Sequence, residues 1–174
     1  QTELFKLLPN NGAYADMFGT SVAIDGALAE AQAVCLIRDL VNTPAEDMGP
    51  AALEEQCEAL AKTHAARLEV TRGDTLEQEY PMVHAVGRAA ARHHAPRIMH
   101  LTWGKESDPV LAIVGKGVCF DSGGLDVKSS SGMLLMKKDM GGAAHAIALA
   151  GLVMGAHLPV RLHLLVPAVE NAIS

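Results

Sequence analysis

The sequence predicts an α/β fold, a three-layer αβα domain with a largely parallel mixed sheet. Segments with helical spacing of apolar residues alternate along the chain with short segments typical of strands. The strand predicted from Pro109 is joined to the strand predicted from Val160 by a long segment that contains a helix, the connection that parallel strands need. A length of 174 residues with 49% hydrophobic residues is sufficient for one sizeable core.

The first predicted elements are two helices. Residues 1–26 show no clear pattern, and we expect them to be a connector. Residues 27–42 are rich in helix-forming residues, and Pro44 prevents their helix from continuing. Pro50 stands at the first position of a second helix, predicted over residues 50–64 from its apolar stripe.

Shorter elements are predicted after the second helix. Residues 68–70 alternate in the manner of a short strand. Asp74 and Glu77 have the spacing of a capping box, which predicts a brief helix that Pro81 ends. The pair His93-His94, flanked by arginines, predicts a solvated turn.

Three strands and one long helix are predicted in the second half of the chain. Residues 98–103 alternate as a half-buried strand does, whereas residues 109–114 are continuously apolar, which is typical of a strand covered on both faces. Residues 143–155 are apolar nearly all round and predict a buried helix. Residues 160–166 predict a further strand.

The glycine-rich segment 114–142 carries the candidate chemistry. It contains Lys116, Asp121, Lys128 and Asp139, directly after a predicted strand, and ligands of α/β sheets bind at the carboxyl ends of strands. Carboxylates suit divalent cations, and a lysine can bind a metal once it has lost its proton. Isolated lysines and aspartates are more often surface or cap residues, but so many glycines indicate close approach of the backbone.

Composition excludes several function classes. A formal charge of −6 gives no overall electrostatic footprint for nucleic acid or anionic lipid. The three cysteines are widely spaced in apolar surroundings, which is typical of reduced thiols and favours a cytoplasmic protein. No apolar run approaches the roughly 20 residues that span a bilayer, so we expect no membrane association.

Other catalytic motifs are not supported. The sequence Asp-Ser-Gly-Gly at residues 121–124 is similar to that around a chymotrypsin-like nucleophile, but that class needs an all-β fold. The eight histidines form no His-Glu-x-x-His motif. His145 is more typical of an ordinary helix residue than of a group behind a metal ligand, and Cys119 of a buried apolar residue than of a nucleophile.

The runs V-G-K-G-V-C-F-D-S-G-G-L-D-V-K, from Val114, and M-K-K-D-M-G-G-A-A, from Met136, resemble the two-metal leucyl aminopeptidases. This family is also called the PepA-like cytosol aminopeptidases, or peptidase family M17. The pieces R-D-L-V-N-T-P-A-E-D-M-G-P and P-A-V-E-N-A-I-S are similar to it as well. The resemblance covers residues 27–174, which would be the N-terminal part of a zinc-peptidase-like catalytic domain, whereas residues 1–26 would connect it to a mostly absent N-terminal domain.

The resemblance implies a role for five residues. Lys116 and Asp139 match ligands of the more tightly held metal ion, and Asp121 matches the carboxylate shared by both ions. Lys128 matches the lysine that polarises the peptide carbonyl and stabilises the oxyanion. Met136 matches a methionine that lines the pocket for the first side chain of the substrate.

The function implied by the resemblance is that of a metal-dependent aminopeptidase. Such an enzyme releases N-terminal amino acids from peptides with water activated by two divalent ions, Zn²⁺ or Mn²⁺. The resemblance also implies a cytoplasmic homo-hexamer. Two alternatives stay open: a non-catalytic binding or regulatory protein of the same fold, since some relatives bind DNA, and an inactive fragment.

The sequence departs from the family pattern at several points. Asp126 stands where the family often has Ser, and Ser129 where Pro is common after the catalytic lysine. The family's N-T-D-A-E-G-R motif, which holds the remaining metal ligands and a catalytic arginine, is not in this sequence, and we expect it beyond Ser174. We therefore expect these residues alone to hold only part of a two-metal site.

Overall fold

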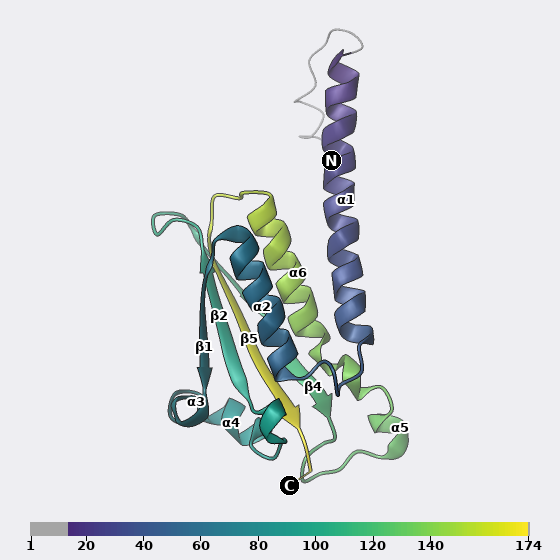
Figure 1. Cartoon of the computed structure of the whole chain (residues 1–174), viewed down its shortest axis with the longest axis vertical. Helices are drawn as coiled ribbons and strands as arrows, with labels where there is room; N and C mark the ends of the chain where they lie inside the picture. Colours follow the sequence, from purple (N-terminus) through teal and green to yellow (C-terminus); the bar gives the residue numbers. More distant parts are fainter. Residues whose placement is uncertain (1–13, 174) are drawn as a thin grey trace.

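A five-stranded mixed sheet forms the centre of the protein, in a computed structural model that describes residues 14–173 (Figure 1). Its strands are β1 (Arg67–Arg72), β2 (Arg97–Trp103), β3 (Val110–Val114), β4 (Gly117–Asp121) and β5 (Arg161–Asn171). The order is β1-β2-β5-β3, and β4 also pairs with β5. The β1–β2 and β2–β5 pairs are antiparallel, whereas β3 and β4 both run parallel to β5.

Helices and 3₁₀ turns lie before and between the strands. They are α1 (Tyr14–Asn42), α2 (Pro50–His64), α3 (Gly73–Glu79), α4 (Pro81–Gly87), η2 (Arg92–His94), α5 (Ser130–Met133), η3 (Met136–Met140) and α6 (Gly141–Gly155), of which η2 and η3 are 3₁₀ turns. Helix α6 connects β4 to the parallel strand β5. The predicted α/β class with a mixed sheet is therefore confirmed.

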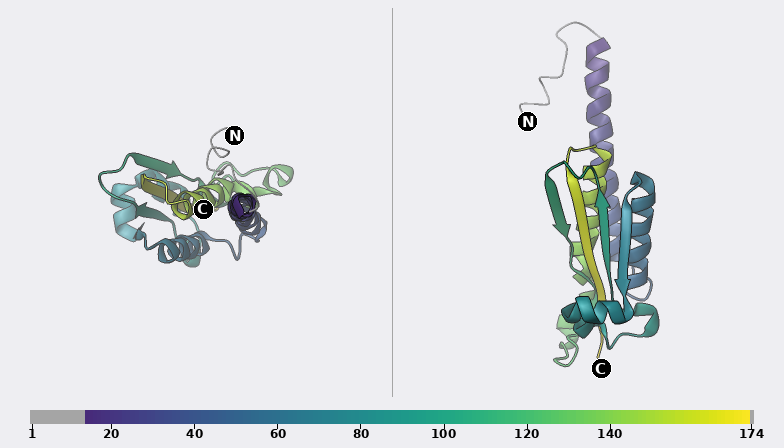
Figure 2. Two further views of the ribbon diagram at one scale, coloured as in Figure 1. Left: turned by 90° about the horizontal axis from the view of Figure 1, so that it is seen from above. Right: turned by 90° about the vertical axis from the view of Figure 1, so that its left-hand side faces the viewer.

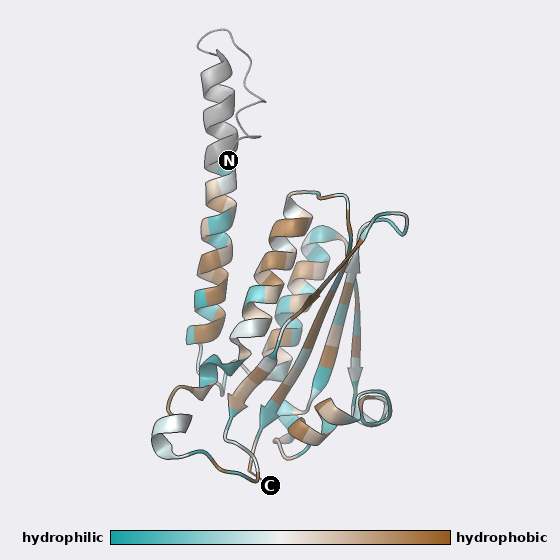
Figure 3. Ribbon diagram, turned by 180° about the vertical axis from the view of Figure 1, so that it is seen from behind, coloured by the Kyte–Doolittle hydropathy of each residue, from teal (hydrophilic) through white to brown (hydrophobic). Residues whose placement is uncertain are grey.

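One face of the sheet carries the hydrophobic core. Alternate residues of β5 are buried, as the period of a strand requires, and α2 and α6 pack over them. The core side chains include Leu53, Cys57, Met99, Leu101, Ile147, Leu162, Leu164 and Val166. Apolar residues, brown in Figure 3, follow the strands and continue into the helices behind them. The predicted apolar helix and the predicted final strand are thus confirmed, although both are longer than expected.

The opposite face of the sheet is less covered. Helix α4 packs against β5, where it and the end of the strand line a common apolar groove. Val110 and Val114 of β3 are each 69% exposed. The prediction that residues 109–114 are covered on both faces is therefore wrong, because alternate residues of β3 are exposed and one of its faces is open in the described structure.

Helix α1 is longer than predicted. It begins at Tyr14 instead of residue 27, so part of the expected connector is helical, while residues 1–13 lie outside the described residues. No proline interrupts this stretch, and a glycine such as Gly26 costs a helix only about 1 kcal/mol. Near its end α1 packs on α6 through residues that include Leu40, and its first half stands clear of the other elements (Figures 1 and 2).

The region after β1 also differs from the prediction. Helix α3 forms, but its N-cap is Arg72 without a side-chain hydrogen bond, so the capping box of Asp74 and Glu77 is absent. Pro81 ends α3 and also begins α4, a helix that the sequence pattern did not predict. His94 is buried in η2 instead of lying in a solvated turn.

Strand β4 was not predicted either. It continues the line of β3 along β5 after a break at Gly115 and Lys116, since β3 pairs with residues 161–165 and β4 with residues 168–171. The sequence pattern did not indicate this strand because glycines flank Lys116, and glycine is unusual in strands. Within the described part of the chain no helix is long and apolar enough to cross a membrane.

Candidate functional site

Strand β4 positions two of the predicted site residues. Lys116 immediately precedes it and Asp121 is its last residue. In regular strand geometry these two side chains would point to opposite faces. Asp121 lies three residues after Val118 on β4, but their partners on β5, Val169 and Asn171, are only two residues apart. This extra residue is a β-bulge, and it moves the side chain of Asp121 to the same face as that of Lys116.

A tight turn after β4 brings Lys128 back to Asp121. Gly123 and Gly124 have φ values of +93° and +65°, which glycine adopts readily. A Cβ on Gly123 would lie 2.2 Å from the carbonyl oxygen of Asp126, so a larger residue does not fit. The backbone N–H of Lys128 donates to the carbonyl oxygen of Ser122 at 2.9 Å and closes the turn.

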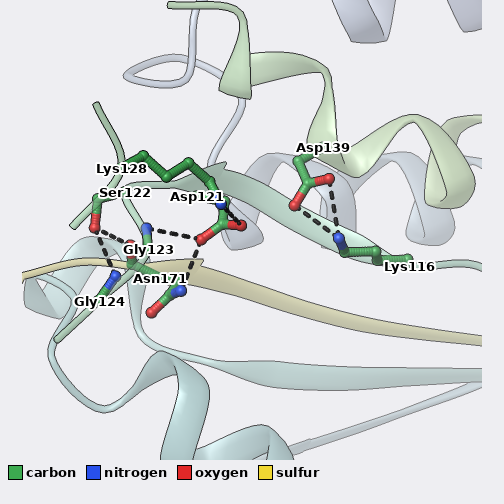
Figure 4. A network of polar contacts seen from close by, with 8 residues as sticks. All are labelled: Lys116, Asp121, Ser122, Gly123, Gly124, Lys128, Asp139 and Asn171. Atoms are coloured by element: carbon green, nitrogen blue, oxygen red, sulfur yellow. Dashed lines mark hydrogen bonds and ion pairs between the residues drawn. The ribbon is translucent and has the colours of Figure 1, made fainter. Parts of the chain in front are cut away.

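Asp121 is the most heavily contacted carboxylate of the site (Figure 4). Its Oδ1 accepts hydrogen bonds from Asn171 Nδ2 at 2.7 Å and from the Gly123 N–H at 3.0 Å. Its Oδ2 lies 2.9 Å from Lys128 Nζ. Burial acts to raise the pKa of Asp121, but the hydrogen bonds from Lys128, Asn171 and Gly123 outweigh burial and hold the pKa below its usual value.

Lys116 and Asp139 form a second pair. Lys116 Nζ donates to Asp139 Oδ1 at 2.9 Å and lies 2.8 Å from Oδ2. The 3₁₀ turn η3 carries Asp139 and packs against β4. A Cβ on Gly142 would lie 3.0 Å from the backbone nitrogen of Lys116, so glycine lets the start of α6 approach the main chain of this lysine closely.

These residues fit a divalent cation. Asp139 Oδ2 is buried and faces the Lys116 ammonium group at 2.8 Å without a further hydrogen-bond donor, so the fold already places positive charge at this oxygen. Two carboxylates and an amine form a hard donor set for Zn²⁺, Mn²⁺ or Mg²⁺. Among the described residues no three His, Cys, Asp or Glu side chains gather around a point, so a cation here would depend on a lysine as well.

The remaining predicted site residue is Met136. It is half-buried at the first position of η3, in the same short turn as Asp139. Lys137 Nζ donates to the carbonyl oxygen of Asn42 at 2.6 Å and so ties this turn to the end of α1. An apolar groove of about 470 Å³ next to Lys116 is lined by α4 and the sheet, and Met136 is not part of its lining.

The secondary candidates have ordinary roles in the structure. His145 is exposed on α6, and its Nδ1 lies 2.7 Å from the carbonyl oxygen of Gly141 in the preceding turn. Cys119 is buried, and burial raises the pKa of its thiol to about 12, so it is no nucleophile near neutral pH. Ser129, the departure after Lys128, caps α5 by accepting a hydrogen bond from the Gly132 N–H at 3.3 Å.

Two polar residues of the site, Ser122 and Asn171, received no role from the sequence. Asn171 holds Asp121, as described above, and its carbonyl oxygen accepts hydrogen bonds from the N–H of Ser122 at 3.0 Å and from its hydroxyl at 2.6 Å. The only signal in the sequence is that each is the second of two polar residues after an apolar run, behind Asp121 and Glu170. A strand that stops at a polar residue is common, so this signal does not identify the contact.

Comparison with known proteins decides the family. The model of the cytosol aminopeptidase family, catalytic domain, matches residues 35–174.

The chain belongs to the cytosol aminopeptidase family.

Individual cytosol aminopeptidases and related structures agree with this assignment. The protein named "Probable cytosol aminopeptidase" from Nostoc punctiforme is 38% identical over 159 residues, which cover 90% of this chain and 32% of that protein. The crystal structure of a cytosol aminopeptidase from Coxiella burnetii is 57% identical with a TM-score of 0.78, over 80% of this chain and 30% of that one. The bottromycin maturation enzyme BotP, in complex with Mn, is 39% identical with a TM-score of 0.79, over 87% and 33% of the two chains.

The cytosol aminopeptidases that the chain matches are considerably longer. The chain spans about a third of the length of these curated relatives. The predicted family is therefore confirmed, and the structure shows how one part of such a protein is built.

Proposed function

We propose that the chain is part of a metal-dependent aminopeptidase that releases N-terminal amino acids from peptides. The observation that carries this proposal is the pairing of Lys116 with Asp139 and of Lys128 with Asp121 on β4 and the adjoining turns, which gathers two carboxylates and two lysines at the end of the sheet. Membership of the cytosol aminopeptidase family supports the same reaction.

Lys116, Asp121 and Asp139 are the residues that would hold the metal ions. When bound, two divalent ions supply a site for the free amine of the substrate and a water of lowered pKa. We consider Mn²⁺ and Zn²⁺ as candidates for both ions, and the structure of BotP in complex with Mn supports Mn²⁺. Lys116 contributes as a neutral amine, so its ammonium contact with Asp139 has to give way when metal binds.

Lys128 has a different role in this proposal. Its ammonium group forms an ion pair with Asp121, and its side chain is 31% exposed. The lysine therefore contacts the carboxylate on one side and solvent on the other. There it polarises the peptide carbonyl and stabilises the negative charge that develops on its oxygen. Met136 would line the pocket for the first side chain, and peptides with a free N-terminus would be the substrates.

We further propose that the complete protein is a cytoplasmic homo-hexamer, as the family resemblance implies. Mass photometry of the protein, produced with any natural sequence that flanks these 174 residues, would then give six times the subunit mass. The formal charge of −6 does not favour nucleic acid as a partner.

Chelation tests the proposed reaction. The same full-length protein should cleave a peptide with a free N-terminus, lose this activity after exhaustive dialysis against a chelator, and regain it with Mn²⁺ or Zn²⁺. The matched control is the same peptide with an acetylated N-terminus, which should not be cleaved. Full activity in a sample that elemental analysis shows to be free of metal would overturn the proposal.

A further inference from the structure

We propose that Asn171 is a positioning residue that fixes the orientation of the Asp121 carboxylate and presents its Oδ2 to a cation. This inference rests on the proposed metal-dependent function and goes beyond it, because it assigns a role to a residue that does not itself bind metal. Asn171 is the last residue of β5, and it is the register partner of Asp121 across the parallel β4–β5 pair.

The side chain of Asn171 occupies one oxygen of Asp121. Its Nδ2 donates to Oδ1 at 2.7 Å, and the Gly123 N–H donates to the same oxygen at 3.0 Å. A carboxylate oxygen has two lone pairs, so these two donors satisfy Oδ1. The other oxygen, Oδ2, faces the positive charge of Lys128 at 2.9 Å and is the one available to a cation (Figure 4).

The backbone of Asn171 fixes the turn that follows Asp121. Its carbonyl oxygen accepts from both the N–H and the hydroxyl of Ser122, at 3.0 and 2.6 Å. The Ser122 hydroxyl in turn accepts from the Gly124 N–H at 3.2 Å. Asn171 therefore holds Asp121 by its side chain and the next residues by its main chain.

Gly124 leaves the space that the Asn171 side chain occupies. A Cβ on Gly124 would lie 2.7 Å from Asn171 Oδ1, closer than side-chain carbons approach other atoms. An ionised carboxylate can only accept hydrogen bonds, so the nitrogen of the amide, and not its oxygen, faces Asp121. Hydrogen-bond partners behind a metal ligand typically change metal affinity or activity by about 10- to 100-fold when they are removed.

The inference is tested with two substitutions in the full-length protein. Asn171→Leu keeps the approximate volume of the side chain and removes the donor, and Asn171→Ala removes the side chain. Asn42→Ala is the matched control, because Asn42 is exposed at the end of α1. Mn²⁺ binding is titrated by electron paramagnetic resonance of the free ion, and kcat and KM are measured with a peptide that has a free N-terminus.

Both Asn171 variants should bind Mn²⁺ at least about tenfold more weakly than the parent protein and show a lower kcat, whereas Asn42→Ala should match the parent. The melting temperature of the metal-free Asn171→Leu variant should stay close to that of the parent, which separates orientation of Asp121 from general damage. If Asn171→Ala unfolds, the Leu variant decides the question.

The failures are distinguishable. A parent protein that cleaves peptides and binds Mn²⁺, with Asn171 variants whose Mn²⁺ affinity lies within about twofold of the parent, would overturn the inference alone, since loss of such a partner should cost about tenfold or more. A parent protein that neither binds Mn²⁺ nor cleaves peptides would overturn the proposed function and the inference together.

Discussion

Lys116 and Lys128 each lie against one carboxylate, so the residues gathered at β4 are close to neutral as a group. The pairs differ in exposure: the side chain of Lys116 is 61% exposed, whereas that of Asp139 is 16% exposed. A cation that replaced the ammonium groups would meet carboxylates already oriented by the fold. In this structure the two ammonium groups thus balance the charge of the two carboxylates.

Lys128→Ala should lower kcat more than it changes KM. The lysine stabilises charge that appears during the reaction, and removal of one such donor typically costs about 100- to 1,000-fold in kcat. Steady-state kinetics of the full-length protein would measure both constants. Lys105→Ala is the control, because Lys105 is exposed in the loop between β2 and β3. A Lys128→Ala enzyme with unchanged kcat and a raised KM would contradict the proposed role.

Gly123→Ala should destabilise the protein and impair activity. Its positive φ of +93° costs a residue with a side chain about 1–3 kcal/mol, and the contact with the Asp126 carbonyl would displace the turn that carries Lys128. Gly26→Ala is the matched control, since nothing lies within 4 Å of the place that a Cβ would take at this position of α1. That change should favour the helix locally by about 0.5–1 kcal/mol and should not lower the urea midpoint, because this half of α1 stands clear of the core. Urea unfolding would measure both, and equal midpoints for the two variants would refute the argument.

At the scale of elements, a buried carboxylate joins α2 to the sheet. Glu54 of α2 is 6% exposed and accepts from Arg97 Nη1 of β2 at 2.6 Å, and it also pairs with Arg72 of β1. Buried charges need such partners because they have lost their contact with water. The ion pairs therefore fix where α2 lies on the sheet.

Arg97→Met should lower the free energy of unfolding by about 3–5 kcal/mol, because it leaves the charge of Glu54 buried with one partner fewer. The matched control is Arg67→Met on β1. Arg67 pairs with Glu69, but its side chain is 76% exposed, so its loss should cost less than about 1 kcal/mol. Chemical denaturation of both variants would give the two values, and equal losses would show that burial of the pair is unimportant.

At the scale of the whole molecule, the core encloses two thiols from separate elements. Cys57 of α2 and Cys119 of β4 are buried, whereas Cys35 of α1 is exposed. Burial raises the pKa of Cys57 and of Cys119 from 9.0 to about 12. Reaction of these thiols therefore requires the core to open.

A thiol reagent at about pH 8, just below the pKa of a free thiol, should label Cys35 quickly and the other two cysteines only after the protein unfolds. Of these three cysteines, peptide mapping by mass spectrometry should find a label on Cys35 alone in the native protein and on all three in urea. The raised pKa values also predict that stability is complete below pH 9 and is lost as the pH rises toward 12, because the unfolded chain ionises its thiols first. Rapid labelling of Cys57 in native protein would show that α2 detaches on its own.

Much of the fold could be predicted because it depends on local patterns. Apolar spacing identified α2, α6 and the last strand, and prolines identified where the early helices end or begin. Strand β4 escaped prediction because Gly115 and Gly117, a residue type unusual in strands, flank Lys116; Gly115 lets α6 approach and Gly117 lets β5 approach. The burial of β3 was mispredicted because an apolar run does not show which faces of a strand other elements cover.

The sequence by itself was enough to identify the family and to predict the four charged residues of the candidate site, because their spacing along the chain is a property of the motif. Only the tertiary structure decided which charges meet. A bulge in β4 turns Asp121 round, a glycine turn returns Lys128 to it, and β5 delivers Asn171 from a distant part of the chain. These contacts depend on strand register and on space left by missing side chains, and neither is encoded in the spacing of residues.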